Sequence, residues 1–329
     1  MKKIINPNKE TWTTILERPT QTVEDIENTV NQIFQDVQQN GDFAVSKYTS
    51  MFDGIELEDS LVSNEEIEKA TNTISDELKI AINQAKQNIE TFHKAQKTSK
   101  IEIETTKGVQ CWQEKRPIEK IGLYIPGGTA PLFSTVLMLA IPAQIACCKE
   151  IVLCSPPNNE GNIANEILYA AQLCGCTKII KVGGIQAIAG LTFGTATIPK
   201  VYKIFGPGNQ FVTVAKQLST KYGIAIDMPA GPSELLVVAD DSANAAYVAS
   251  DLLSQAEHGT DSQVILVSTS KALMNDVEKE VYEQLKLLPR KAIAEKAINN
   301  SKLIYVENDE IALNLINEYG PEHFIICTD

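Results

Sequence analysis

The sequence has no long apolar run and no excess of basic residues, and each absence excludes a class of protein. The longest strongly apolar stretch, Val136–Cys148, contains Pro142 and Gln144 and falls short of the roughly 20 residues that cross a bilayer. The polar opening Met1–Glu10 is unlike a signal peptide. A net charge of −13, from 42 acidic and 29 basic residues, repels phosphate groups. We therefore expect no nucleic-acid and no membrane partner.

The cysteines do not form a disulfide or metal framework. There are seven, an odd number, and none has the CxxC spacing of redox or zinc-ribbon motifs. This composition favours a reducing, cytoplasmic location over an oxidising one. We interpret all seven as small, mostly buried residues without a catalytic role; they are Cys111, Cys147, Cys148, Cys154, Cys174, Cys176 and Cys327.

What the chain does have is an alternation of short apolar runs and amphipathic segments from about residue 119 onward. Its 329 residues suffice for about two domains, and strands that alternate with helices indicate an α/β fold with largely parallel sheets. The predicted strands are Ile121–Ile125, Ile151–Cys154, Ile179–Val182, Val201–Phe205, Leu235–Val238, Val264–Val267, Leu303–Val306 and Phe324–Cys327. The predicted helices between them are Ser134–Cys148, Ile163–Leu173, Gln186–Phe193, Gln210–Lys221, Ser242–His258 and Lys271–Leu287.

The first hundred residues are helical in pattern and offer no obvious site. Residues 1–20 are predicted to form an extended arm. Thr22 is a candidate N-cap for a helix to about Gln39, because Val23 begins a stripe of apolar residues three or four apart. Asn64–Lys97 predicts one or two further helices.

Glycine-rich turns follow several of the predicted strands. In open α/β sheets, ligands bind beyond the carboxyl ends of the strands, so these turns are candidates for the rim of a cofactor crevice. None has the full GxGxxG pattern with a following acidic residue, and their spacing alone favours simple turn geometry. The turns are Pro126–Gly128, Gly183–Gly184, Gly206–Asn209 and Ala230–Ser233.

Two of the three histidines lie in dense polar motifs, whereas His93 sits in a polar helical stretch and is interpreted as a surface residue. In SQAEH, Gln255 and His258 are three residues apart near a helix end, so both face the same side. They are candidate ligands of a divalent metal, but the spacing favours a histidine that caps the last helical carbonyls, because two ligands do not make a site.

In the GPEH motif, Glu322 and His323 follow a proline-stiffened turn just before a strand. A carboxylate and an imidazole at an opening are able to divide proton transfer between them, the first activating water and the second shuttling a proton near neutral pH. A solvated turn is the equal alternative from the residues alone.

Five segments, taken in order, resemble histidinol dehydrogenases: GLYIPGG (122–128), FGPGN (205–209), IDMPAGPSE (226–234), LLSQAEHGTDSQ (252–263) and YGPEH (319–323). The resemblance runs from about residue 20 to the last residue. It implies oxidation of L-histidinol through the aldehyde to L-histidine, the last two oxidations of histidine biosynthesis, with reduction of two NAD. It also implies a zinc ion that holds the substrate and does not activate the water.

The resemblance assigns roles to eight residues. It implies that Glu322 and His323 are the catalytic pair, with Glu322 activating water and His323 also touching substrate. It implies zinc ligation and substrate contact for Gln255 and His258, and substrate contact for Ser233. The implied NAD contacts are Tyr124, Gln186 and Asn209.

The implied architecture has two incomplete Rossmann-like domains, the second inserted in the first, in a homodimer. On this chain the arm is expected at 1–20, the first domain at 21–123 and 234–329, and the inserted domain at 124–233. Family members continue beyond the position of Asp329, and that stretch supplies two more zinc ligands, an aspartate and the partner subunit's histidine. We therefore expect this 329-residue chain to bind zinc weakly and to turn over poorly or not at all.

A second hypothesis belongs to a different class. A non-catalytic NAD-binding or interaction module would retain the fold without the reaction. Intact SQAEH and GPEH motifs favour the dehydrogenase, because a module that performs no chemistry has no physical need for them.

Overall fold

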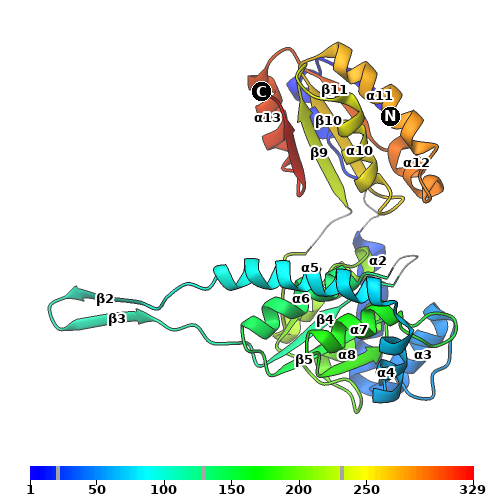
Figure 1. The fold of residues 1–329 in the computed structure, drawn as a ribbon, viewed down its shortest axis with the longest axis vertical. Coiled ribbons are helices and arrows are strands. Elements are labelled where there is room, and N and C mark those ends of the chain that lie inside the picture. The colour runs from blue at the N-terminus through cyan, green and yellow to red at the C-terminus, as the bar shows by residue number, and fades with distance from the viewer. Residues whose placement is uncertain (20–22, 128–130, 230–232) are drawn as a thin grey trace. The chain divides into compact units, whose positions relative to one another are not determined.

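A computed structural model describes the chain except for residues 20–22, 128–130 and 230–232, and it divides into two compact units (Figure 1). Unit 1 comprises Met1–Thr22 and Gly231–Asp329, and unit 2 comprises Val23–Ala230. The inserted arrangement expected from the sequence is therefore found, with unit 2 lying in the chain between the two parts of unit 1.

Unit 1 contains a five-stranded sheet in the order β1-β11-β10-β9-β12, in which every pair of neighbours is parallel. The chain runs from β9 to β10 to β11 in one direction across the sheet, and β12 then lies on the other side of β9. The strands are β1 (Lys2–Ile5), β9 (Glu234–Ala239), β10 (Gln263–Ser268), β11 (Lys302–Tyr305) and β12 (Phe324–Cys327).

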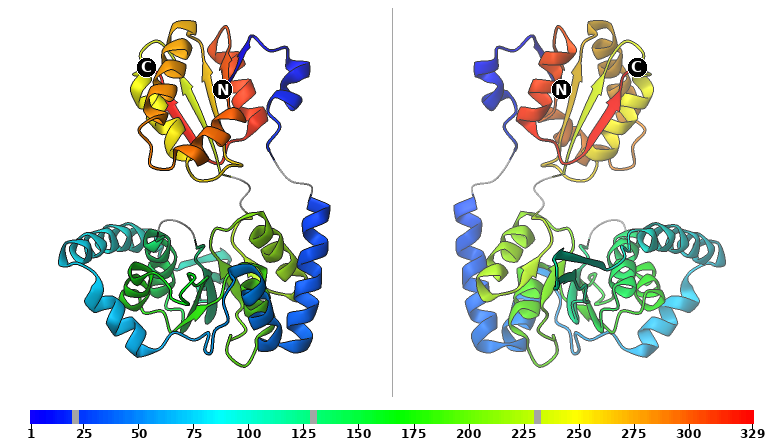
Figure 2. Two further views of the ribbon diagram at one scale, coloured as in Figure 1. Left: turned by 90° about the vertical axis from the view of Figure 1, so that its right-hand side faces the viewer. Right: turned by 90° about the vertical axis from the view of Figure 1, so that its left-hand side faces the viewer.

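Helices cover both faces of this sheet (Figure 2). Successive strand residues point to opposite faces: Leu235 and Val237 of β9 pack in the same cluster as the helices α10, α11 and α12, whereas Leu236 packs in a second cluster with α13 and α1. The helices are η1 (Lys9–Thr11), α1 (Trp12–Ile15), α10 (Ala245–Ala256), α11 (Lys271–Leu285), α12 (Lys291–Asn299) and α13 (Asp309–Tyr319).

Unit 2 has a second five-stranded parallel sheet, in the order β6-β5-β4-β7-β8. The strand order reverses between β4 and β7, which makes this pair the topological switch point of the sheet. The strands are β4 (Lys120–Tyr124), β5 (Glu150–Ser155), β6 (Lys178–Lys181), β7 (Lys203–Phe205) and β8 (Ala225–Ile226).

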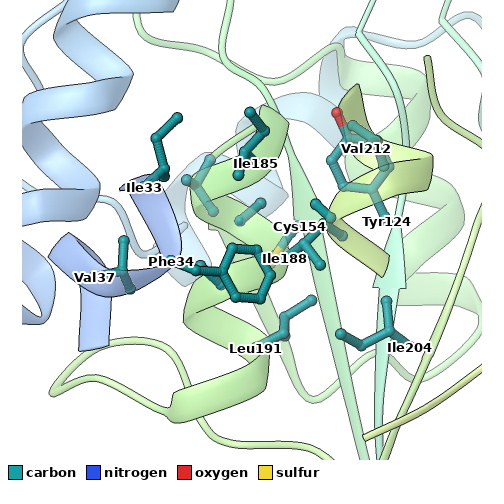
Figure 3. Close-up of a cluster of buried hydrophobic side chains, with 14 of the residues drawn as sticks. Ile33, Phe34, Val37, Tyr124, Cys154, Ile185, Ile188, Leu191, Ile204 and Val212 are labelled. Carbon is teal, nitrogen blue, oxygen red and sulfur yellow. The ribbon is translucent and has the colours of Figure 1, made fainter. Parts of the chain in front are cut away.

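Two helical layers enclose the sheet of unit 2. On one face Phe34, fully buried, lies in one cluster with Ile188 and Leu191 (Figure 3). On the other face Ile82 packs in a cluster with Ile121 and Leu123. The first layer has α2 (Val23–Asn40), α3 (Asp42–Asp53), α8 (Gly184–Phe193) and α9 (Gln210–Ser219), followed by η2 (Thr220–Tyr222). The second has α4 (Asn64–Thr73), α5 (Asp76–Ala95), α6 (Phe133–Ile145) and α7 (Asn165–Leu173).

The predicted domain boundaries differ from this division. The sequence-based expectation joined residues 21–123 to 234–329, but the helices of residues 23–95 bury their apolar stripes on the sheet of unit 2. The predicted extended arm is also more than an arm, because Lys2–Ile5 pairs with β11 as an edge strand of unit 1.

All eight predicted strands are confirmed, and so are the predicted helices, with shifts of a few residues at their ends. Thr22, the candidate N-cap, lies outside the described residues. The sequence-based prediction did not include β1, β8, α1, α3, α12, α13 or the hairpin of β2 (Ile101–Thr106) and β3 (Val109–Gln113). That antiparallel hairpin projects from unit 2 with every residue of its strands exposed (Figure 1). Its first strand does alternate apolar and polar residues, with Ile101 and Ile103 followed by glutamates, so this pattern could have identified it.

Candidate functional site

The unit 1 residues predicted to act in chemistry gather at the amino-terminal edge of its sheet. Ser233 directly precedes β9, and its carbonyl accepts a hydrogen bond from the N–H of Gln263, the first residue of β10 (3.1 Å). His323 directly precedes β12, and its carbonyl accepts from the N–H of Leu236 (3.0 Å). Because all neighbouring strands are parallel, Ser233 and the Glu322–His323 pair lie at one edge.

The GPEH motif is the turn between α13 and β12. Gly320 ends α13 in the left-handed conformation, with φ of 57°, and its N–H bonds the carbonyl of Ile316 (2.8 Å). The Glu322 N–H donates to the carboxylate of Glu234 at 3.0 Å. The side chains of both Glu322 and His323 are exposed, so both are available to a ligand.

Gln255 and His258 lie where α10 ends, in the segment that returns the chain to the amino end of β10. The N–H of His258 donates to the carbonyl of Gln255 (3.2 Å), which closes the last turn. Gln255 is half-buried and His258 is exposed. The capping interaction considered for the His258 imidazole is not among the observed contacts. The two side chains come from the same helix end, as the sequence predicted.

Three buried polar residues that the sequence analysis overlooked support the same edge. Glu234 and Gln263 stand opposite each other as the first residues of β9 and β10, and the hydroxyl of Tyr319 lies 3.1 Å from a carboxylate oxygen of the first and 3.1 Å from the amide oxygen of the second. Burial is the largest influence on the pKa of both Tyr319 and Glu234. It raises the pKa of Tyr319, whereas for Glu234 the hydrogen bonds from Arg18 and Glu322 outweigh it and lower the pKa.

In unit 2 the predicted cofactor residues gather at the carboxyl ends of the strands. Tyr124 ends β4 at the switch point with β7, and it is 4% exposed. Its hydroxyl accepts a hydrogen bond from the N–H of Gly184, at the start of α8 (3.1 Å). Burial raises the pKa of Tyr124 to about 12, so the phenol stays protonated at neutral pH.

Gln186 lies in the first turn of the same helix and is completely buried. Neither its amide nitrogen nor its amide oxygen has a hydrogen-bond partner among the residues the structure describes. An unpaired buried amide costs roughly 1–3 kcal/mol. A bound molecule with both a donor and an acceptor would remove that cost, which makes this amide a candidate ligand contact.

Gly206 begins the FGPGN turn after β7, and only glycine fits there. Its φ is 131°, and a β-carbon would lie 2.1 Å from the carbonyl oxygen of Tyr124. Asn209 caps α9, its side chain accepting from the N–H of Val212 (3.1 Å). Lys216 stabilises the turn, because it donates a hydrogen bond to the Gly206 carbonyl (2.7 Å) and forms an ion pair with Asp227.

Comparison with known proteins decides the family. The model of the family described as histidinol dehydrogenase matches residues 16–329. A histidinol dehydrogenase of Bacteroides thetaiotaomicron is 57% identical over 329 residues, which are 100% of this chain and 77% of that protein. One of Haemophilus influenzae is 53% identical over 315 residues, covering 95% of this chain and 73% of the relative.

A solved structure agrees. The crystal structure of histidinol dehydrogenase from Elizabethkingia anophelis has a TM-score of 0.94 and 54% identity to this chain, covering 99% of this chain and 75% of that one. The chain belongs to the histidinol dehydrogenase family. It is thereby placed among oxidoreductases and biosynthetic enzymes for histidine. Across the described residues, no helix is both long and apolar enough to cross a membrane.

The histidinol dehydrogenase family implies a zinc ion, but the described residues supply only some of the ligands that a zinc site needs. A closed zinc site takes four ligands. Gln255 and His258 offer two donors, and within the described parts of the chain no group of three or more histidine, cysteine or acidic residues comes together. These residues by themselves do not fit a tight zinc site.

The seven cysteines differ in burial from the prediction. Cys154 is completely buried, and burial raises its thiol pKa far above the ordinary value. Cys174 is also buried, but Cys111 and Cys147 are exposed and the other three are partly exposed, so "mostly buried" was wrong for most of them. The histidinol dehydrogenase motifs contain none of the seven residues.

One apolar hollow in the described part of unit 2 lies away from these residues. It measures about 440 Å³ and is lined by residues that include Ile118, Met138 and Phe205, with none of the predicted site residues among them. The pattern of polar groups therefore locates the candidate site better than concavity does.

Proposed function

We propose that this chain catalyses the NAD-dependent oxidation of L-histidinol through L-histidinal to L-histidine. Family membership supports the assignment. The observation that carries it is the placement of Glu322 and His323 on one exposed turn, at the same sheet edge as Ser233. A carboxylate and an imidazole side by side suit a reaction that removes protons from an alcohol and then from water.

NAD fits the residues at the carboxyl edge of unit 2. The unpartnered amide of Gln186 offers both a donor and an acceptor, and Gly206 lets the FGPGN turn lie against the main chain of Tyr124, because no side chain separates them. Tyr124, Gln186 and Asn209 would hold the dinucleotide, in agreement with the switch-point rule. Bound NAD would supply the acceptor for hydride.

The protein's own groups would handle the protons. In the first oxidation, the His323 imidazole would take the proton of the alcohol as the carbon loses hydride. The aldehyde must then gain water, because only the hydrated form has a second hydride to lose. Glu322 would accept a proton from that water, and His323 would again take the hydroxyl proton of the hydrate.

Glu322→Gln tests this assignment. The amide cannot accept a proton, so we expect conversion of added aldehyde to acid to fall by about 10²- to 10⁴-fold, with less effect on the first oxidation. NADH formation and trapping of the aldehyde with a hydrazine report the two steps separately. Glu318→Gln, an exposed glutamate of the preceding helix, is the matched control.

Two outcomes would reject the proposal. A Glu322→Gln protein that oxidises aldehyde at the full rate would remove Glu322 from water activation. A wild-type chain that binds NAD but forms no NADH from histidinol, with zinc supplied, would instead favour a non-catalytic NAD-binding module.

We further propose a homodimer, as the family resemblance implies, and a cytoplasmic location, which the odd number of cysteines favours. Light scattering coupled to size-exclusion chromatography would distinguish a dimer from a monomer of 36.1 kDa. The high acidic charge argues against a nucleic-acid or anionic membrane partner.

A further inference from the structure

An arginine outside every motif of the sequence analysis contacts the GPEH turn. Arg18 follows α1 in the N-terminal part of unit 1. Its guanidinium donates from one nitrogen to the carbonyl of Tyr319 (2.9 Å) and is 3.3 Å from the carbonyl of Gly320. These carbonyls belong to the two residues where α13 ends and the turn to Glu322 begins. Arg18 also lies over the ring of Tyr319, at 4.3 Å from its centroid.

The same guanidinium forms a two-point ion pair with Glu234. Its Nε and Nη2 each donate to one carboxylate oxygen, the second at 2.9 Å. The Glu234 side chain is 7% exposed and the Arg18 side chain is 37% exposed. A nearly buried carboxylate requires a charged partner, and Arg18 is the cation that the structure pairs with it.

Glu234 also contacts the other end of the turn, at Glu322. Its Oε1, which accepts from Arg18, also accepts the N–H of Glu322 at 3.0 Å. The turn is therefore held on both sides: its first carbonyls bond Arg18, and the N–H of Glu322 bonds the carboxylate that Arg18 orients. Glu322 and His323 themselves are exposed, so their main chain has to be fixed by such contacts.

We propose that Arg18 is a positioning residue for the reaction: through Glu234 and the carbonyls of Tyr319 and Gly320, it fixes the main chain that presents Glu322 and His323. This rests on the proposed function, which assigns proton transfer to that pair. Arg18 touches no reacting atom. Its role requires the planar fork of a guanidinium, because a lysine is a single point charge and cannot bond both carboxylate oxygens and a carbonyl in the same plane.

The test compares Arg18→Ala and Arg18→Lys with Arg116→Ala, which removes an exposed arginine of unit 2. Hydrogen exchange followed by mass spectrometry reports on a peptide that contains residues 319–324, with β10 as the internal reference. We expect exchange in that peptide to rise on the order of tenfold in Arg18→Ala, less in Arg18→Lys, and not in Arg116→Ala, while β10 keeps its protection.

Catalysis supplies the second readout. We expect kcat to fall about 10- to 100-fold in Arg18→Ala, with the KM for NAD unchanged and with partial recovery in Arg18→Lys. A purely stabilising role would instead lower the protection of β10 and the melting temperature, and leave kcat of the folded fraction unchanged.

The two hypotheses fail separately. If wild-type protein forms no NADH but Arg18→Ala loosens the 319–324 peptide alone, the proposed function fails and the positioning of the turn stands. If wild-type protein is active and Arg18→Ala keeps both its kcat and its exchange pattern, the positioning role is overturned and the proposed function stands.

Discussion

Gly206 and Tyr124 approach each other so closely that a β-carbon on the first would lie 2.1 Å from the carbonyl oxygen of the second. Tyr124 ends β4, and Gly206 directly follows the adjacent strand β7, where the order of the sheet in unit 2 reverses. This contact brings the FGPGN turn and Tyr124 of GLYIPGG together at the switch point. A side chain at Gly206 would force them apart.

We therefore expect Gly206→Ala to lower the free energy of unfolding by more than about 2 kcal/mol, from the clash and from the positive φ together. We also expect it to abolish NAD binding, because the turn that carries Asn209 has to shift. Gly223→Ala is the control: Gly223 has a φ of 80° with nothing within 4 Å of its β-carbon position, so only the conformational cost of about 1 kcal/mol applies. Equal losses in the two variants would contradict the close-contact argument.

Gln186→Met should separate stability from cofactor binding. The replacement keeps the side-chain volume and removes a buried amide that lacks a partner among the described residues. We expect the NAD-free protein to gain up to about 1–2 kcal/mol of stability and its affinity for NAD to fall by about tenfold or more. Chemical unfolding with and without NAD measures both effects. A variant that is less stable and yet binds NAD normally would show that the amide is satisfied within the protein.

Glu234 predicts the behaviour of unit 1 in acid. Burial raises its pKa, but the hydrogen bonds from Arg18 and the Glu322 N–H outweigh burial, so the folded pKa lies below the ordinary value of 4.5. A lowered carboxyl pKa stabilises the fold above the unfolded pKa, and this contribution is lost as the pH falls from about 4.5 through the folded value. Wild-type protein should therefore lose stability in that window.

Glu234→Gln removes the titrating group and checks the assignment. We expect the variant to be about 1–3 kcal/mol less stable than wild type at pH 7, and the difference to shrink as the pH drops below 4.5. Urea unfolding at several pH values provides the measurement. A difference that stays constant down to pH 3 would place the acid sensitivity on other carboxyls.

The two predicted zinc ligands that the structure describes should bind zinc weakly by themselves. Gln255 and His258 supply two donors, whereas a closed zinc site takes four. Titration calorimetry with zinc is expected to give either no saturable site or one that His258→Ala removes, with His93→Ala as the control on a half-buried histidine of unit 2. One tightly bound zinc per purified chain, together with normal turnover, would refute this expectation.

The eight predicted strands and the inserted arrangement of two α/β units were readable from the sequence, because buried parallel strands form continuous apolar runs and the intervening helices have apolar stripes. The β2–β3 hairpin was readable too, because Ile101 and Ile103 alternate with glutamates, but its exposure on both faces was not. The predicted domain boundary near residue 120 differs from the observed division. An apolar stripe on α2 or α5 indicates that the helix packs against a sheet, but it does not indicate which sheet.

For the two histidine motifs, too, some features follow from the sequence and others only from the tertiary structure. The spacing of SQAEH and GPEH singled out Gln255, His258, Glu322 and His323, and the local chain alone puts each pair together. Only the tertiary structure brought Ser233 and Glu322 to one sheet edge and joined Arg18 to Glu234 across 216 positions of sequence. Such a contact leaves no periodic trace in the chain, because it depends on how β9, β12 and the segment after α1 converge. The sequence singled out the groups that are proposed to carry the chemistry, and the fold decided what holds them in place.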